Sequence, residues 1–258
     1  MTQIKKKDTG TDNQRNFDNI AQYYDSIYNK KEYAEETERL LKYIDNNSDG
    51  KSHLLEIGSG TGNHTLFLQN DFSITSVEPS MKMVETARLK TNVNIINSTI
   101  EKATLPDQKF DIAICLFHVI NYITDSEQLE KSISVISNSL KEGGKFIFDS
   151  WHTPGVYSIG PSSRTVTFEH NGVKMRRTSK PNIDIEKNII EVKFIFEQVE
   201  SSESQKIEEI HRMRPFSIPE ISNLLKKHQL IPIVHQNQSS NKLTLADWDF
   251  FSVYEKRS

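Results

Sequence analysis

The feature that most constrains the fold is an apolar segment that runs straight into a glycine-rich loop. Leu54, Leu55 and Ile57 are typical of a strand over 53–57, and a helix is expected to begin near Asn63. Between them stand three glycines, Gly58, Gly60 and Gly62. Glycine lets the backbone turn sharply and approach a ligand closely, and free N–H groups at a helix start favour a polar or anionic group. This order of strand, tight loop and helix is typical of a doubly wound α/β sheet.

An acidic residue follows at the end of the next expected strand. Glu78 comes twenty positions after Gly58, directly behind the apolar segment 73–77. A carboxylate at this place can accept hydrogen bonds from both hydroxyls of a ribose. The loop and the acid together predict a nucleoside-binding half-site.

Strand and helix patterns alternate over the first part of the chain, which implies parallel strand pairing. Two more strands, near 230–235 and 247–254, are expected to complete the sheet. The fold class is therefore expected to be α/β, with a doubly wound, mostly parallel seven-stranded sheet. The expected parallel strands are 53–57, 73–77, 93–97, 110–116 and 145–150, with helices over 62–70 and 80–90 and a third helix after 124.

Local signals mark the ends of two helices. Thr124 and Glu127 form a capping box that is expected to start the third helix, and Gly143-Gly144 is expected to end it. Ser217 and Glu220 form a second box, which predicts the helix that returns to the main sheet.

Residues 152–214 have a different pattern. Segments 163–178, 189–199 and 206–214 are of mixed polarity and β-rich, and Asn171-Gly172 is a strong hairpin signal. A second break is expected at Pro181-Asn182. We therefore expect an antiparallel β insertion, a lid or floor over the substrate pocket, between two parts of a core at 14–151 and 215–258. Residues 1–13 are expected to be disordered, and helices within 17–28 and 31–45 to close over the site.

Composition limits the partners that this chain can take. The formal net charge is −3, and no dense basic run follows the lysines at positions 5–7, so no nucleic-acid partner is expected. The single cysteine, Cys115, excludes an internal disulfide and fits a reducing cytoplasm. Neither a signal peptide nor a membrane-spanning segment is evident, and no histidine pair has metal-ligand spacing. We expect a cytoplasmic protein without a metal or a membrane contact.

Four segments in order carry a family resemblance. Residues 56–62, Glu-Ile-Gly-Ser-Gly-Thr-Gly, resemble the first motif of class I S-adenosylmethionine-dependent methyltransferases, written E/D-x-G-x-G-x-G. Residues 77–83, 110–115 and 140–146 are similar to that family's later segments. The rival nicotinamide fingerprint, G-x-G-x-x-G, would require glycine where Asn63 stands.

The resemblance implies S-adenosyl-L-methionine as cofactor and S-adenosyl-L-homocysteine as its product. In the family, the acid of the second motif binds the ribose and a nearby apolar side chain covers the adenine. Thr99 stands where the family often has an acid, so its contact to the adenine amino group is left open against a plain turn. The implied cofactor-binding residues are Tyr24, Glu56, Gly58, Gly60, Gly62, Glu78, Pro79, Met83, Thr99, Ile100 and Leu116.

The acceptor site is expected beyond the carboxyl ends of the fourth and fifth strands. His118 titrates near neutral pH and can orient or deprotonate an acceptor, or pack without transferring a proton. The candidate catalytic residues are His118, Tyr122 and His152. The candidate substrate-binding residues are Tyr28, Trp151, Arg164 and Arg214; the two arginines belong to a set of guanidiniums that can receive a phosphate or form salt bridges on a strand face.

Within the family, the layout most resembles N-methyltransferases of nucleotide-linked amino sugars, over roughly residues 20–235. The resemblance implies a small polar acceptor, and the expected oligomeric state is a monomer or a homodimer. O-methylation of a sugar, a phosphate-bearing or another small metabolite is the alternative. A non-catalytic cofactor-binding protein and a nicotinamide-dependent redox enzyme are the remoter hypotheses.

Overall fold

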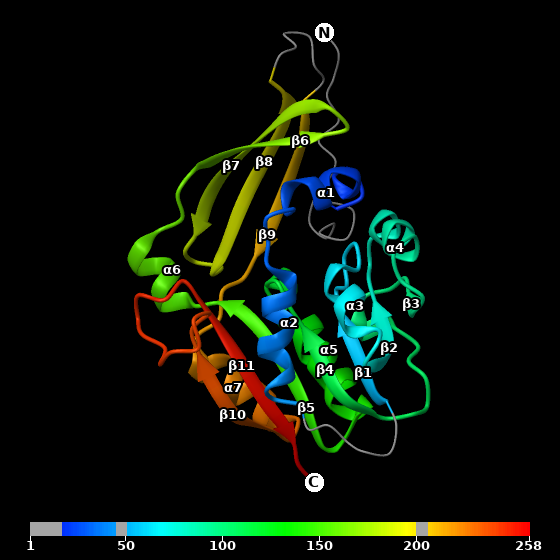
Figure 1. Cartoon of the computed structure of the whole chain (residues 1–258). Helices are drawn as coiled ribbons and strands as arrows, with labels where there is room; N and C mark the ends of the chain where they lie inside the picture. Colours follow the sequence, from blue (N-terminus) through cyan, green and yellow to red (C-terminus); the bar gives the residue numbers. More distant parts are fainter. Residues whose placement is uncertain (1–16, 45–50, 200–205) are drawn as a thin grey trace, which may run out of the picture.

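The computed structural model describes residues 17–44, 51–199 and 206–258. A seven-stranded sheet forms the lower part of the molecule, and a four-stranded sheet stands above it (Figure 1). The strand order is β10-β11-β5-β4-β1-β2-β3, and β11 alone runs opposite to the rest of the sheet. The expected doubly wound, mostly parallel sheet is therefore confirmed. Its strands are β1 (Ser52–Ile57), β2 (Phe72–Val77), β3 (Asn94–Ile96), β4 (Phe110–Cys115), β5 (Leu140–Trp151), β10 (Leu230–Gln236) and β11 (Asp249–Lys256).

Helices cover both faces of this sheet because side chains alternate along each strand. On β1, Leu55 packs in a core with Ile133 of α5 (Ser126–Ser139) and Leu225 of α7 (Ile218–Lys227). Its neighbour Leu54 points to the opposite face and packs with Leu40 of α2 (Tyr33–Leu41). All five of these leucine and isoleucine side chains are completely buried. The two cores hold the sheet rigid beneath the loops at its carboxyl edge.

The remaining helices of the described residues are short. They are α1 (Ala21–Ile27), α3 (Asn63–Leu68), α4 (Met81–Arg88), α6 (Thr153–Ile159), and the 3₁₀ helices η1 (Ile100–Lys102) and η2 (Val119–Tyr122). Nowhere in the described part of the chain does a helix have the length and hydrophobicity that a membrane span requires.

The insertion is a four-stranded antiparallel sheet in the order β6-β7-β8-β9. Asn171 and Gly172 connect the first two strands with φ of 51° and 78°, as a tight hairpin of this sequence requires, so the expected hairpin is confirmed. The strands are β6 (Arg164–His170), β7 (Val173–Asp184), β8 (Ile189–Gln198) and β9 (Ile207–Met213).

The expected break at Pro181-Asn182 is wrong. Strand β7 continues through Pro181, which lies opposite Val192 of β8. Pairing with β6 stops at Ser179, so β7 is an edge strand from there on, and an edge strand tolerates a residue without an N–H donor.

Two expected helix ends also differ. The N-cap of α5 is Asp125, whose Oδ1 accepts the N–H of Gln128 at 2.8 Å, rather than Thr124. The helix ends at Ser139, and Gly143-Gly144 lie inside β5. Ser217 caps α7 as expected, and its Oγ accepts the N–H of Glu220.

The first helix ties the upper sheet to the core. Ile20, just before α1, packs with Phe168 and Phe196 of the four-stranded sheet, and α1 also contacts α4. The expected disordered tail at 1–13 and the end of the second expected helix lie outside the described residues.

Candidate functional site

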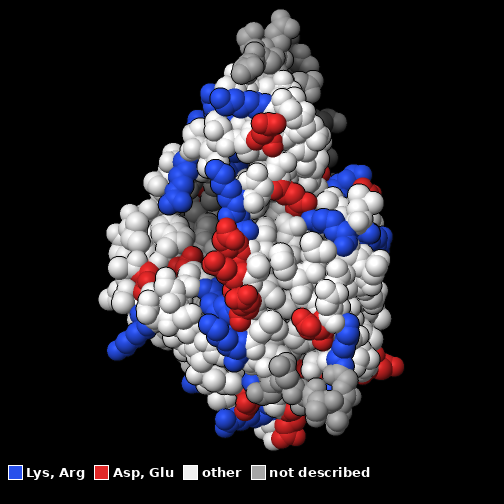
Figure 2. Space-filling model, in the orientation of Figure 1, with Lys and Arg blue, Asp and Glu red and all other residues white. Residues whose placement is uncertain are grey.

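A cavity of about 660 Å³ lies between the carboxyl edge of the seven-stranded sheet, α1 and the four-stranded sheet. Figure 2 shows a hollow between the upper and lower parts of the molecule, with basic and acidic side chains along its rim. Cavities of this size are typical of sites for small molecules. The loops after β1, β2, β4 and β5 all contribute to its lining.

The glycine loop and Glu78 form one end of this cavity. Gly58, Gly60 and Gly62 have φ of 71°, 55° and 79°, a region that favours glycine. The carboxylate of Glu78 accepts the N–H of Gly60 at 2.9 Å and the N–H of Ser80 at 2.8 Å. Burial raises the pKa of Glu78 to about 7, although both hydrogen bonds oppose the shift.

The turn after β4 lies directly against the loop. A Cβ atom on Gly58 would lie 2.5 Å and 2.6 Å from the two methyl carbons of Val119, so only glycine fits there. Phe117 and His118 both have positive φ, of 61° and 62°, which is uncommon for residues other than glycine. Such strained positions cluster at ligand sites.

Helix α1 is attached to the glycine loop by Asp25. Its Oδ1 accepts from Thr61 Oγ1 at 2.6 Å and from Asn63 Nδ2 at 3.1 Å, and Oδ2 lies 2.8 Å from Lys90 Nζ. Burial raises the pKa of Asp25, but these three partners outweigh it and the pKa is lowered. The contacts hold Tyr24 against the cavity.

Two residues that the family resemblance assigns to the cofactor lie outside the cavity lining. Glu56 lies beneath the loop, where its Oε2 accepts from Thr65 Oγ1 at 2.5 Å and from Ser76 Oγ at 2.8 Å. Gly62 faces α4, and a Cβ there would lie 3.2 Å from Ala87 Cβ. Both positions support the loop from behind.

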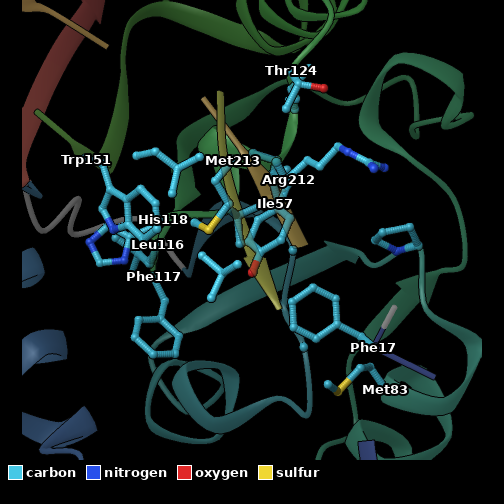
Figure 3. Close-up of a pocket in the computed structure, with 18 of the residues that line it drawn as sticks. Phe17, Ile57, Met83, Leu116, Phe117, His118, Thr124, Trp151, Arg212 and Met213 are labelled. Carbon is cyan, nitrogen blue, oxygen red and sulfur yellow. The ribbon is translucent and has the colours of Figure 1, made fainter. Parts of the chain in front are cut away.

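His118 and Trp151 form the wall at the other end. In Figure 3 their rings lie side by side with Leu116 and Phe117, away from Phe17 and Met83. The His118 N–H donates to Asp149 Oδ1 at 2.6 Å. The imidazole Nε2 lies 3.5 Å from Asp249 Oδ2 but forms no hydrogen bond with a described residue. Burial lowers the pKa of His118, the two carboxylates outweigh it, and the pKa is raised.

His152 and Arg214 do not line the cavity. His152 is buried, and its Nδ1 lies 3.2 Å from the carbonyl oxygen of Asp247. Arg214 turns away to Glu220 at 2.5 Å, and its neighbour Arg212 lines the cavity instead. The other sequence-based candidates are brought together there: Tyr24, Tyr28, Gly58, Gly60, Glu78, Pro79, Met83, Thr99, Ile100, Leu116, His118, Tyr122, Trp151 and Arg164.

Several lining residues were missed by the sequence analysis. Phe17 and Tyr33 belong to segments that read only as amphipathic helices, and Trp248 precedes β11 without a motif around it. Aromatic residues at helical spacing are normally core residues, so the pattern gives no signal that separates them from packing.

Comparison with known proteins shows which domain part of the chain resembles. Residues 54–144 match the methyltransferase domain family model. The chain thus contains a methyltransferase domain. A dTDP-3-amino-3,4,6-trideoxy-α-D-glucopyranose N,N-dimethyltransferase of Streptomyces venezuelae is 24% identical over 147 residues, which are 54% of this chain and 60% of the relative. An uncharacterized protein of Methanocaldococcus jannaschii is 31% identical over 133 residues, 51% of this chain and 49% of the relative. The chain spans only about half the length of these relatives.

Solved structures share the fold. An S-adenosylmethionine-dependent methyltransferase from Clostridium acetobutylicum aligns with a TM-score of 0.79 at 21% identity, over 94% of this chain and 99% of that one. The sugar N-methyltransferase KedS8 from a Streptoalloteichus species aligns with a TM-score of 0.76 at 20% identity, over 91% and 93% of the two chains.

The residues around the loop fit the cofactor of this family, S-adenosylmethionine. Gly58 and Gly60 leave the backbone open to the cavity, and the buried Glu78 carboxylate faces it as an acceptor for hydroxyl groups. Among the described residues, no group of three or more His, Cys, Asp or Glu side chains is arranged to hold a metal ion.

The raised pKa of Glu78 predicts a pH-dependent affinity for the cofactor. Hydroxyl donors favour the ionised carboxylate, so binding is expected to require loss of the proton that Glu78 holds below its pKa of about 7. The Kd for S-adenosylhomocysteine should be constant above that pH and rise, by up to about tenfold per pH unit, below it. Isothermal titration calorimetry across this range checks the slope. A flat profile in the wild type, or the same slope in Glu78→Gln, would contradict it.

Proposed function

We propose that the methyltransferase methylates the nitrogen of an amino sugar that is carried on a nucleotide. The main support for this proposal is that a single continuous cavity contains both parts of the site. One space joins the glycine loop to Trp151 and to the arginines Arg164 and Arg212 of the four-stranded sheet. A cofactor and a second, polar molecule can therefore meet inside one enclosed site.

On the cofactor side, we propose that residues of the loops at the carboxyl edge of the sheet contact S-adenosylmethionine. Glu78 accepts from the ribose hydroxyls, Met83 and Ile100 cover the adenine, and Tyr24 closes the site from α1. When bound, S-adenosylmethionine supplies an already activated methyl group, so the chain's own work is alignment and exclusion of water. The remaining proposed cofactor contacts are Gly58, Gly60, Pro79, Thr99 and Leu116, with Glu56 and Gly62 supporting the loop.

On the acceptor side, Trp151 and Tyr28 form proposed walls for the sugar, and Arg164 faces the same cavity. A guanidinium binds phosphate oxygens with two parallel hydrogen bonds. Arg164 lies in an exposed stretch at the start of β6, so its charge is available to a phosphorylated acceptor. His118 and Tyr122 line the space between these walls and the cofactor side.

The relatives support an amino-sugar acceptor. The Streptomyces venezuelae protein is named as an N,N-dimethyltransferase of a nucleotide-linked amino sugar, and KedS8 as a sugar N-methyltransferase. We accordingly propose a role in carbohydrate biosynthesis in the cytoplasm, with the protein acting as a monomer or a homodimer.

O-methylation of a sugar or another small metabolite is the second candidate. His118 favours it, because a hydroxyl acceptor needs a base and the His118 imidazole lines the cavity. The carboxylates of Asp149 and Asp249 raise the pKa of His118 against the effect of burial, which increases its strength as a base but also the fraction that is already protonated at neutral pH.

An acceptor assay separates the two candidates. The protein is incubated with S-adenosylmethionine and dTDP-3-amino-3,4,6-trideoxy-α-D-glucopyranose, or with the matched sugar that has a hydroxyl in place of the amine, and products are analysed by mass spectrometry. We expect one or two methyl groups on the amine and none on its matched hydroxyl compound. Methylation of the hydroxyl compound alone would favour the second candidate, and methylation of neither sugar would contradict a sugar acceptor of this type.

A further inference from the structure

A buried chain of three polar side chains leads from the cavity into the four-stranded sheet. Tyr122 lines the cavity, and its Oη lies 3.0 Å from Nδ1 of His211. The other ring nitrogen of His211, Nε2, lies 3.0 Å from Oε2 of Glu209. His211 is 1% exposed and Glu209 is 4% exposed. A buried histidine and glutamate are costly unless they are hydrogen-bonded, so this arrangement requires an explanation.

The backbone fixes the positions of these three side chains. Glu209 and His211 are two residues apart on β9 and therefore point to the same side of the sheet. Tyr122 ends η2, which is joined to the end of β9 by two hydrogen bonds: Arg214 N–H to the Asn121 carbonyl at 2.8 Å, and Asn121 Nδ2 to the Arg214 carbonyl at 2.6 Å. Residues far apart in the sequence are thus held in contact by one main-chain bond and one side-chain bond.

Two phenylalanines enclose the imidazole. The ring of Phe17 lies edge-on to His211 at 4.9 Å and to Tyr122 at 5.3 Å. The ring of Phe194 approaches His211 from β8, edge-on at 4.8 Å. With apolar rings on these sides, the imidazole exchanges protons along its two hydrogen bonds rather than with bulk water.

The hydrogen bonds define a direction. An ionised Glu209 can only accept, so it takes the Nε2 proton of His211 and leaves Nδ1 with its lone pair. Nδ1 then accepts the Tyr122 hydroxyl proton, and the phenol oxygen keeps its own lone pairs as an acceptor. The opposite tautomer would require a neutral Glu209 as donor to Nε2.

We propose that Tyr122, His211 and Glu209 form a proton relay on the acceptor side of the cavity. The relay rests on the proposed function, since it takes its proton from the acceptor nitrogen. Tyr122 contacts the acceptor and is the catalytic residue of the three; His211 and Glu209 act through it as positioning residues.

The proton transfer balances within the site. An N–H bond of the acceptor ammonium breaks, its electron pair stays on nitrogen as the lone pair that attacks the methyl group, and the proton bonds to Tyr122 Oη. The original O–H bond of Tyr122 breaks as its proton moves to Nδ1 of His211. The positive charge has then moved from the ammonium to an imidazolium beside the Glu209 carboxylate. Methyl transfer leaves a methylated ammonium, which has no lone pair to take the proton back. The relay proton is therefore released through Tyr122 to solvent when the product leaves the cavity.

Other charged and titratable groups face this relay. Tyr28, which follows α1, raises the pKa of Tyr122, and Arg177 of β7 lowers it. Asp18 raises the pKa of Glu209. Burial raises the pKa of Tyr122, so its phenol stays protonated when no acceptor is present. Burial also raises the pKa of Glu209, and the hydrogen bond from His211 opposes that shift.

A direct test needs no acceptor. We would label the full chain with ¹⁵N-histidine, assign His211 by its absence in His211→Gln, and record both ring nitrogens at neutral pH. We expect a protonated Nε2 and an unprotonated Nδ1, and Tyr122→Phe should shift the Nδ1 signal, whereas the control Tyr157→Phe on α6 should not. A protonated Nδ1 in the wild type would overturn the relay.

Kinetics provide the second test, with the aminated dTDP sugar named above as the probe. Tyr122→Phe and Glu209→Gln should each lower kcat by about 10²-fold, the usual size of a general-base effect, and leave the Kd for S-adenosylhomocysteine unchanged. The double variant should be no slower than either single one, because the groups act as a unit. Glu208→Gln, the adjacent residue that pairs with Lys193 on the exposed face of β9, is the matched control.

The two tests separate the inference from the function it rests on. If the wild type methylates no amine, the proposed function is wrong. The tautomer of His211 can still be measured in that case, and it shows whether the hydrogen bonds of the relay run in the proposed direction. An active wild type with unchanged kcat in Tyr122→Phe would overturn the relay and leave N-methylation intact.

Discussion

Replacement of Glu78 by alanine is expected to weaken S-adenosylhomocysteine binding by about two orders of magnitude or more. The carboxylate is proposed to accept two ribose hydroxyls, and hydrogen bonds to a charged group contribute about 1.5 to 3 kcal/mol each. It also accepts the N–H groups of Gly60 and Ser80, so its loss leaves the loop without the contacts that fix its position. Isothermal titration calorimetry above pH 7, where the wild-type carboxyl is ionised, measures the difference.

The control for this variant is Glu85→Ala on α4. Glu85 pairs with Lys82 on the exposed side of that helix and is not one of the residues that line the cavity. The Glu85→Ala protein should bind S-adenosylhomocysteine with the same Kd as the wild type. Wild-type affinity in a folded Glu78→Ala protein would show that the nucleoside is held elsewhere, and the site built on the glycine loop would then be wrong.

The sequence predicted the cofactor edge because that edge depends on short-range patterns. Gly58 and Gly60 are needed for positive φ, and Glu78 follows its strand directly, so spacing along the chain places all three near one another. The seven-stranded sheet followed from the same alternation of strands and helices. Asn171-Gly172 was informative for an equally local reason, since the turn itself requires those two residues.

The acceptor side was less predictable because contacts distant in the sequence decide it. His152 and Arg214 stand beside residues that do line the cavity, but their side chains contact Asp247 and Glu220 instead. The pairing of Tyr122 with His211 spans the whole insertion. A single sequence contains no local signal for such a contact, and only the docking of η2 on β9 creates it.

Gly58→Ala is expected to cost about 3 kcal/mol of folding free energy, of which about 1 to 2 kcal/mol comes from the left-handed backbone and the rest from overpacking. The added Cβ would lie within 2.6 Å of both methyl carbons of Val119 and 3.1 Å from its Cβ. A β-branched side chain cannot rotate freely to make room. For a chain of this length, about 3 kcal/mol corresponds to a decrease in Tm of roughly 6 to 12 °C, measured by differential scanning calorimetry.

Two further variants separate the two contributions to this loss of folding free energy, the contact with Val119 and the left-handed backbone. Gly143→Ala also places alanine at a positive φ, of 77°, but a Cβ there meets nothing within 4 Å, so it should show the backbone cost alone. Val119→Ala removes the two methyl carbons, and the double variant with Gly58→Ala should lose less stability than the two single changes added together. Equal losses in Gly58→Ala and Gly143→Ala would mean that Val119 moves aside at no cost. The close contact between η2 and the glycine loop would then not be what requires glycine at position 58.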